Sequence, residues 1–145
     1  MKTHHQFISL NTEQGIHITD ITPQLRDIIS ESDINNGLVT ISSMHTTLAL
    51  SVNEAEERLL IDIDNYFSKL VPAEDNYLHN DLHLRDVPPD EPENAHAHII
   101  AMMLGNSDTL AVVDGQPVLG TYQSLMACEL DGPRQLKISV QVMGH

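Results

Sequence analysis

Histidines and carboxylates gather in the middle third of this 145-residue sequence. The stretch DNYLHNDLHLRD, residues 75–86, contains two histidines and three aspartates, and ENAHAHII adds His96 and His98. Imidazole and carboxylate groups are the usual ligands of zinc and related divalent ions. These residues are therefore either ordinary surface groups or ligands of a divalent metal such as zinc or magnesium.

His45 stands apart because its neighbours build the core. It lies in SSMHTTLALSVNE, at an expected bend between two apolar strands, and Asn53 and Glu54 follow the second strand. A polar His-Thr-Thr sequence inside a core-forming stretch must be hydrogen-bonded or coordinated, because an unpaired buried polar group costs stability. A structural histidine and a ligand histidine both satisfy that condition.

Spacing limits how the other histidines can act together. His79, Asp81 and His83 occupy alternate positions, so an extended backbone would place all three on one side. His96 and His98 are two residues apart, which on a helix separates their directions by about 200°. Only one of these two can reach a given ion, and the neighbouring sequence does not say which.

The C-terminal third offers donors for an anion. VLGTYQ contains Gly120, Tyr122 and Gln123, and Arg134 follows the expected turn Asp131-Gly132-Pro133. A guanidinium fork suits phosphate or carboxylate. The alternative is a turn glycine and a surface arginine without a ligand.

Charge and composition exclude several classes of partner. The chain has 7 basic and 21 acidic residues, a net charge of −14, which argues against nucleic acid and against anionic membranes. Neither a signal peptide nor a membrane-spanning run is expected from the sequence. Cys128, the single cysteine, cannot form an internal disulfide and is expected to be buried and inert. A cytoplasmic protein is therefore predicted.

The local patterns alternate between strands and helices. QFISL and GIHITDI predict a hairpin across NTEQG, and Thr22 and Pro23 have the types expected at the N-cap and first position of a helix. Residues 38–52 predict two strands, or one strand bent near His45. Asn53 is expected to cap a helix over residues 53–70. Its apolar stripe would comprise Leu59, Leu60, Ile63, Tyr66, Phe67 and Leu70.

Residues 72–93 contain four of the seven prolines and predict a long loop, of a length that is often functional. A second helix follows over residues 93–104 and ends at Gly105, and the remaining sequence predicts strands joined by DG and DGP turns. This order predicts an α+β fold, with mainly antiparallel sheets packed against about three helices in a single domain, residues 1–145.

Five motifs in order resemble the YjbQ-like family: HTT followed by NE, YLHND, HAHI with LG, GTYQ, and ELDGPR. The resemblance covers essentially the whole chain. It implies a compact α+β domain that assembles as a homotrimer. Some members of the family are described as having a secondary thiamine-phosphate synthase activity, and some carry a metal or anion at the site.

The resemblance also implies which residues form the site. Tyr122 is a departure, because the family often has Trp there, so the shape and polarity of the pocket are left open. The residues expected to hold a divalent metal are His45, His79 and His98. Those expected to contact or transform the substrate are His45, Asn53, Glu54, Asp81, Gln123 and Arg134.

Two functions follow from these expectations. In the first, the chain is an enzyme acting on a small phosphorylated metabolite, joining an aminopyrimidine diphosphate to a thiazole phosphate. In the second, a non-catalytic trimer binds a metal or a small anionic metabolite at the same histidines. A third possibility is that the histidines are structural and hold the 72–93 loop against a neighbouring chain.

Overall fold

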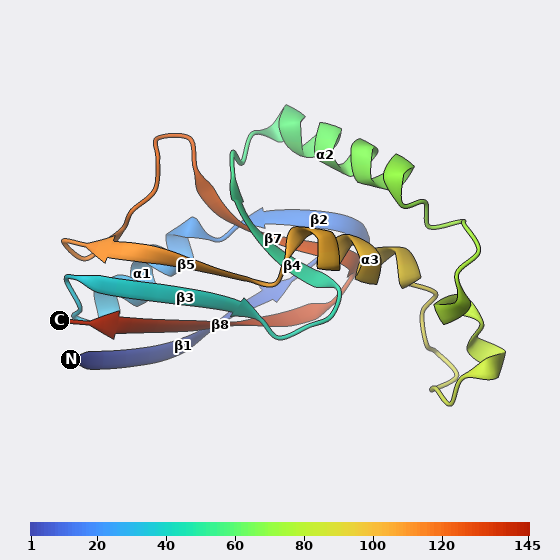
Figure 1. Cartoon of the computed structure of the whole chain (residues 1–145), viewed down its shortest axis with the longest axis horizontal. Helices are drawn as coiled ribbons and strands as arrows, with labels where there is room; N and C mark the ends of the chain where they lie inside the picture. Colours follow the sequence, from blue (N-terminus) through green and yellow to red (C-terminus); the bar gives the residue numbers. More distant parts are fainter.

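Two antiparallel sheets face each other and three α-helices pack around them (Figure 1). The computed structural model describes residues 1–145. The larger sheet has the strand order β1-β8-β3-β5-β6, and the smaller sheet has the order β2-β7-β4. The predicted α+β class with antiparallel sheets and three helices is confirmed. The strands are β1 (Lys2–Asn11), β2 (Gly15–Asp20), β3 (Gly37–Ser43), β4 (Leu48–Asn53), β5 (Ser107–Val113), β6 (Gln116–Pro117), β7 (Ser124–Gly132) and β8 (Gln135–Gly144).

The predicted hairpin between residues 6 and 21 is wrong, although both of its strands exist. β1 pairs with β8 from Lys2↔Gly144 to Asn11↔Gln135, whereas β2 pairs with β7 in the other sheet. The two ends of the chain therefore form one antiparallel ribbon that bends from the large sheet into the small one. A local pattern of alternating residues identifies strands but not partners that are over a hundred residues away.

The bend of this ribbon lies where residues 12–14 run beside residues 132–134. The Thr12 backbone N–H donates to the Arg134 carbonyl at 2.9 Å, and the Arg134 N–H donates to the Thr12 hydroxyl at 3.0 Å. A Cβ added to Gly132 would lie 1.9 Å from the Glu13 carbonyl oxygen. Only glycine permits this approach, so the turn glycine foreseen in the sequence is required by backbone packing.

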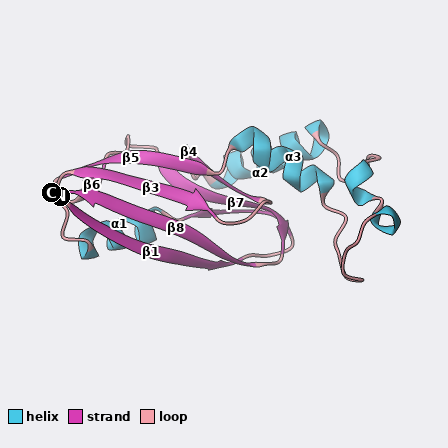
Figure 2. Cartoon of the chain, turned by 60° about the horizontal axis from the view of Figure 1, so that its bottom comes forward, coloured by secondary structure: helices cyan, strands magenta, loops and turns pink.

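Apolar side chains from both sheets and one helix fill the space between the sheets. The core cluster contains 17 buried residues, including Leu48 and Leu50 of β4 and Ile138 and Val140 of β8. Helix α1 (Thr22–Glu31) adds Leu25, which is fully buried, together with its neighbours on the same face. Figure 2 shows α1 at one side of the strands, far from the other helices. Burial of this aliphatic surface is the main favourable term in folding.

Helix α1 begins as the sequence suggested, but its cap differs. Thr22 is the first helical residue rather than the N-cap, and Pro23 lies in the first turn. The Thr22 hydroxyl accepts the Leu125 N–H at 2.9 Å, while Asp20 Oδ1 accepts the Thr22 N–H at 2.9 Å. The Thr22 side chain therefore bonds to strand β7, and it is Asp20 that accepts an N–H from the first turn of the helix.

Helix α2 (Glu57–Leu70) starts later than expected, so Asn53 does not cap it. Asn53 ends β4, where it pairs with Ser124, and Glu56 caps the helix by accepting the N–H groups of Arg58 and Leu59 at 3.0 and 2.6 Å. No residue of α2 is fully buried. Of the predicted stripe, Leu59, Leu60, Ile63 and Phe67 are half-buried, whereas Tyr66 and Leu70 are exposed.

The 72–93 segment is a long connection, as predicted, but it is not extended. It contains two single 3₁₀ turns, Leu78–Asn80 and Leu82–Leu84, so alternation does not place His79, Asp81 and His83 on one side. Helix α3 (Ala95–Leu104) follows and ends at Gly105, whose φ of 93° suits glycine. It lies across the outer face of the small sheet (Figure 1). None of the helices combines the length and the apolarity needed to cross a membrane.

Leu25→Ala should lower the free energy of unfolding by about 2–5 kcal/mol, because the fully buried leucine leaves a cavity between the sheets. Leu84→Ala is the matched control. Leu84 is 75% exposed, so the same deletion there should change stability by less than about 0.5 kcal/mol. Urea denaturation measures both, and equal effects would contradict this description of the core.

Candidate functional site

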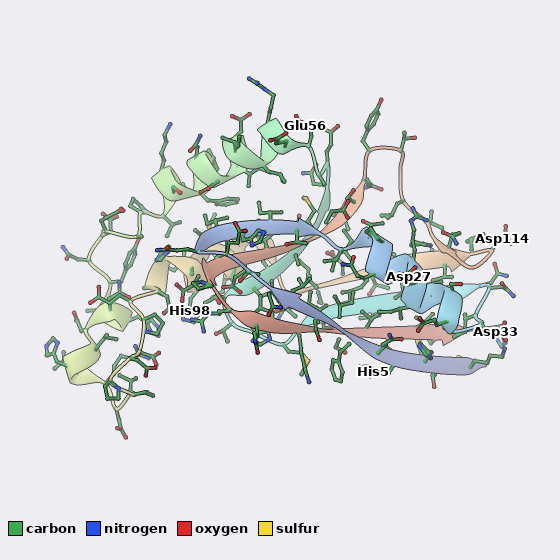
Figure 3. The ribbon with its side chains drawn as sticks, turned by 180° about the vertical axis from the view of Figure 1, so that it is seen from behind. His5, Asp27, Asp33, Glu56, His98 and Asp114 are labelled. Carbon is green, nitrogen blue, oxygen red and sulfur yellow. The ribbon has the colours of Figure 1, made fainter.

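A polar hollow of about 340 Å³ lies at one end of the sandwich. Its lining comes from three places: the β3–β4 loop, the segment leading into α3 with its first turn, and the β7–β8 turn. Figure 3 shows His98 at this end, opposite the end that carries Asp33 and Asp114. A second hollow of about 480 Å³ adjoins it and shares His45, Thr46 and His98. The residues lining the first are Met44, His45, Thr46, Thr47, Glu91, Pro92, Asn94, His98 and Arg134.

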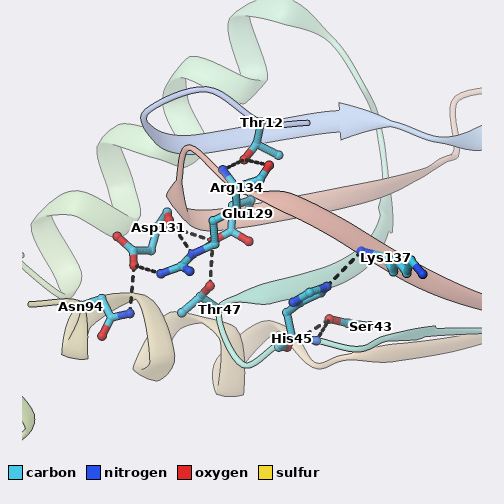
Figure 4. Close-up of polar contacts among 9 residues, drawn as sticks. All are labelled: Thr12, Ser43, His45, Thr47, Asn94, Glu129, Asp131, Arg134 and Lys137. Carbon is cyan, nitrogen blue, oxygen red and sulfur yellow. Dashed lines mark hydrogen bonds and ion pairs between the residues drawn. The ribbon is translucent and has the colours of Figure 1, made fainter. Parts of the chain in front are cut away.

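His45 is fixed by contacts on both sides of its loop. The Ser43 hydroxyl accepts the His45 N–H at 3.2 Å and donates to the His45 carbonyl at 3.1 Å. The imidazole Nε2 accepts the backbone N–H of Lys137 at 2.9 Å (Figure 4). This bond places the ring proton on Nδ1, so the side chain retains one N–H donor for another molecule. The expected bend at His45 is confirmed: it is where the chain passes from the large sheet to the small one.

Arg134 is held by its own turn. Its Nη2 donates to Asp131 Oδ2 at 2.7 Å and its Nε donates to the Asp131 carbonyl at 3.0 Å, while Asn94 Nδ2 donates to the same carboxylate at 2.9 Å (Figure 4). The side chain of Arg134 is 38% exposed. Its Nη1 forms no bond within the chain, so an oriented guanidinium edge is available in the hollow.

A fully buried carboxylate lies behind this arginine. Glu129 has no exposed surface; its Oε1 accepts the Thr47 hydroxyl at 2.7 Å and the Asp131 N–H at 2.8 Å, and lies 4.0 Å from Arg134 Nε. Its Oε2 has no hydrogen-bond partner in the chain. The glutamate therefore ties the β3–β4 loop to the β7–β8 turn and fixes two walls of the hollow relative to each other.

Two histidines meet beside the hollow. The rings of His79 and His98 are 4.8 Å apart between centroids and nearly perpendicular. Burial lowers the pKa of His98, and its neighbour His79 lowers it further, against a weaker opposing effect of a backbone hydrogen bond to Thr46. Of His96 and His98, between which the sequence did not choose, it is His98 that lines the hollow and contacts His79.

The three-histidine metal site is not formed within the chain. No group of three histidine, cysteine, aspartate or glutamate side chains is arranged to hold a metal ion. His79 and His98 supply two neighbouring imidazoles, but His45 already uses Nε2 to accept the Lys137 N–H. A zinc site needs four ligands, of which at least three usually come from protein, so the chain alone does not meet this requirement.

Other residues expected at the site lie elsewhere. Asn53 and Glu54 are at the far end of β4, where Asn53 Oδ1 accepts the Glu54 N–H at 2.8 Å. Gln123 precedes β7 near that same end, and its Oε1 accepts the Gly120 N–H at 2.8 Å. Asp81 lines a separate acidic hollow beside the 3₁₀ turns. The structure thus brings His45, His98 and Arg134 into one hollow, with His79 beside it against His98. Asp81 lies near His79 but lines a different hollow, and Asn53, Glu54 and Gln123 lie away from both.

The sequence patterns did not assign Asn94, Glu129 or Asp131 to the site around Arg134. They indicated that the Thr47 hydroxyl would be hydrogen-bonded, without identifying Glu129 as the partner. One signal for Glu129 was present, because a carboxylate stands within the otherwise apolar run LMACEL. A buried charge in a central strand requires paired donors, and such pairing is common at functional sites.

The chain is a small α+β protein, a two-sheet sandwich with a hollow at one end that His45, Thr46, Thr47 and Arg134 help to line. The chain belongs to the YjbQ-like family: the family model described as "UPF0047 protein YjbQ-like" matches residues 6–145. A UPF0047 protein of Methanothermobacter thermautotrophicus is 37% identical over 144 residues, which cover 99% of this chain and 94% of that protein. One from Archaeoglobus fulgidus is 38% identical over 136 residues, covering 94% and 98%.

Solved structures support the same assignment. A crystal structure from Sulfolobus solfataricus P2, described as a YbjQ-like protein of unknown function, superposes with a TM-score of 0.89 at 33% identity, covering 99% of both chains. A hypothetical protein from Aeropyrum pernix K1 has a TM-score of 0.87 at 32% identity, covering 98% of this chain and 99% of that one. The resemblance in the sequence motifs is therefore confirmed at the level of the family.

The pKa of His98 predicts a pH dependence of stability. Because its folded-state pKa lies below the ordinary value of 6.5, the folded protein binds fewer protons than the unfolded chain as pH falls. The stabilisation is complete above about pH 6.5 and is lost as pH falls through the lowered folded-state pKa.

His98→Gln should reduce the loss of unfolding free energy between pH 7 and pH 5, as measured by urea melts. His83→Gln, at an exposed position, should follow the wild type; a pH profile of His98→Gln identical to wild type would contradict this assignment.

Thr47→Val should destabilise the protein by about 1–3 kcal/mol, because it removes the hydroxyl that donates to the buried Glu129 carboxylate. Thr46→Val makes the same chemical change at an exposed position next door and should alter stability by less than about 0.5 kcal/mol. Thermal and urea unfolding of the two variants measure the difference. If Thr47→Val were as stable as Thr46→Val, the Thr47–Glu129 hydrogen bond would not be what joins the β3–β4 loop to the β7–β8 turn.

Proposed function

We propose that this protein is an enzyme that binds a small phosphorylated metabolite in the hollow formed by His45, His98 and Arg134. The observation that carries the proposal is the held guanidinium: Asp131 orients Arg134 and leaves its Nη1 available. A fixed arginine edge recognises phosphoryl oxygens with directional hydrogen bonds. The Nδ1–H of His45 is a second donor in the same hollow.

The reaction we propose is the one implied by the family resemblance: an aminopyrimidine diphosphate is joined to a thiazole phosphate. The bond from the pyrimidine methylene carbon to the diphosphate oxygen breaks, and both electrons leave with the diphosphate. The thiazole nitrogen lone pair then forms the new carbon–nitrogen bond. Arg134 would stabilise the charge that develops on the departing oxygens, and no nucleophilic side chain is required.

Charges around Arg134 bear on how such a substrate would bind. Asp131 pairs directly with the guanidinium and Glu129 lies behind it. The Glu91 carboxylate at the edge of the hollow lies 3.8 Å from the Arg85 guanidinium. Each cation thus has a carboxylate beside it, and the protein contributes little net positive charge. A divalent ion that arrives with the diphosphate is therefore part of the proposal. Magnesium suits this better than zinc, because it is commonly held by substrate phosphates, water and one or two carboxylates. Glu91 is the carboxylate that lines the hollow.

The second candidate is a non-catalytic protein that binds a metal or a small anion. One observation favours it: His79 and His98 lie in ring contact, and burial lowers the pKa of His98, which favours the uncharged form that a metal ligand needs. Further ligands would have to come from another chain or from the bound molecule.

We further propose that the protein assembles as a homotrimer in the cytoplasm, as the family resemblance implies for assembly. The outward side chains of the large sheet support contact between copies, since they include no carboxylate although the chain carries −14. Phe7, Leu38 and Met143 on this face are 44%, 47% and 37% exposed. Identical acidic chains can approach each other most easily through a face without like charge.

The anion site is tested by titrating inorganic diphosphate with magnesium into the protein and measuring heat. Arg134→Met should weaken binding at least tenfold, because it removes the oriented donors. Arg26→Met is the matched control, since Arg26 lies on α1 and bonds Gln116 Oε1 at 2.6 Å, away from the hollow. Equal affinities of the two variants would contradict the role of Arg134.

Catalysis is tested in the same preparations with the aminopyrimidine diphosphate and the thiazole phosphate as substrates. His45→Ala should abolish formation of the joined product while light scattering still gives three chains per particle. Turnover that is unchanged in His45→Ala would contradict the enzyme, and diphosphate binding without any turnover would favour the binding protein.

A further inference from the structure

A chemically different cavity, distinct from the hollows described above, lies under α2. Its floor is the outer face of the small sheet, its roof is α2, and Leu104 at the end of α3 forms a wall. The cavity has a volume of about 200 Å³. Figure 1 shows α2 running along the outside of the molecule, connected at both ends by loops. The lining residues are Ile16, Ile18, Ser51, Asn53, Ile63, Phe67, Leu104, Met126, Cys128 and Leu130.

Strand pleating explains why this face is apolar. Successive residues of β7 alternate between the two faces, so Met126, Cys128 and Leu130 point to the outer side while Glu129 joins the network behind the hollow. The floor and the buried carboxylate therefore share a strand but lie on opposite faces of the small sheet.

The space is partly open to solvent and is large enough for a small molecule. Protein interiors are close-packed, and an engineered cavity of about 150 Å³ lined by apolar side chains is large enough to bind benzene. Here the volume is about 200 Å³, and no residue of α2 is fully buried although Ile63 and Phe67 face the floor. The roof thus covers a floor whose β7 side chains are buried, while Ile63 and Phe67 themselves stay half-buried over the pocket.

The lining defines the kind of molecule that would fit. Eight of the ten lining residues are hydrophobic and none is charged, in a chain with 21 acidic residues. Burial raises the pKa of the Cys128 thiol to about 12, so this group is neutral as well. The two polar residues, Ser51 and Asn53, come from the same strand, and Asn53 uses its Oδ1 on the Glu54 N–H, which leaves its Nδ2 donors free.

We propose that the cavity under α2 is a second binding site, for a small uncharged molecule with an apolar body and one hydrogen-bonding group. The body packs between Ile63 and Phe67 above and Met126 and Cys128 below. The polar group accepts a hydrogen bond from the Asn53 amide at the rim. In this proposal Asn53, a motif residue that lies away from the hollow of His45, is the hydrogen-bond donor of the second site.

The size of the space selects a small molecule over a macromolecular partner. Sites for drug-sized ligands are usually about 300–1,000 Å³, so a cavity of about 200 Å³ suits a single six-membered ring or a short branched chain. The uncharged lining also separates this ligand from the phosphorylated metabolite proposed for the hollow, because an anion would lose its hydration without gaining a cation.

Phenol is a suitable probe, because it combines a single ring with one hydroxyl group. We expect the methyl NMR signals of Met126 and Ile63 to shift saturably as phenol is added to the full-length protein. Ser51→Leu, which fills the cavity from its floor, should weaken phenol binding at least tenfold. Ser68→Leu is the matched control on the exposed side of α2 and should bind phenol as the wild type does.

Cys128→Met fills the same space from the neighbouring strand and serves if Ser51→Leu fails to fold. Benzoate, which keeps the ring but adds a charge, should not shift these signals. Shifts that do not saturate, or equal binding by the filled and control variants, would overturn the proposal. So would benzoate binding as tightly as phenol.

Discussion

Packing of aliphatic side chains between the two sheets is the interaction on which the rest of the molecule depends. The facing residues of β4 and β7 in one sheet and β3 and β8 in the other make a continuous buried cluster, closed at one side by α1. Because sheets that pack face to face hold their strands at a fixed spacing, the loops at the ends of the strands acquire fixed positions. The hollow is built at one such end, from the β3–β4 loop and the β7–β8 turn.

Strand β7 contributes side chains to both faces of the small sheet. Its alternate residues enter the core, as Leu125 and Ala127 do, and the next inward position is Glu129 rather than another aliphatic residue. A buried carboxylate is tolerated there because Thr47 and the Asp131 backbone donate to it. The same strand presents Met126 and Cys128 to the outer face, so one pleated segment supports both the polar hollow and the apolar cavity.

The chain has few cations, and the polar hollow accordingly contains a single arginine. With 7 basic residues against 21 acidic ones, the chain places one arginine in the hollow, where Asp131 orients it and Glu129 lies behind it. For the anion that we propose as ligand, this arrangement would provide an oriented hydrogen-bond donor rather than excess positive charge. Burial lowers the pKa of the nearby His98, which disfavours a second positive charge beside the arginine.

The sequence by itself determined the local elements. β-branched runs marked the strands, Pro23 marked the start of α1, Gly105 marked the end of α3, and the polar HTT within an apolar stretch marked the bend at His45. The five motifs also identified the family, since comparing their order along the chain needs no knowledge of contacts. Only the tertiary structure decided which strands pair and that the ring of His79 contacts that of His98. It also decided that Asn53 lines an apolar cavity and that Glu129 joins the β3–β4 loop to the β7–β8 turn. The physical reason is range: propensity and periodicity act over a few residues, whereas pairing and convergence depend on the packing of surfaces contributed by distant parts of the chain.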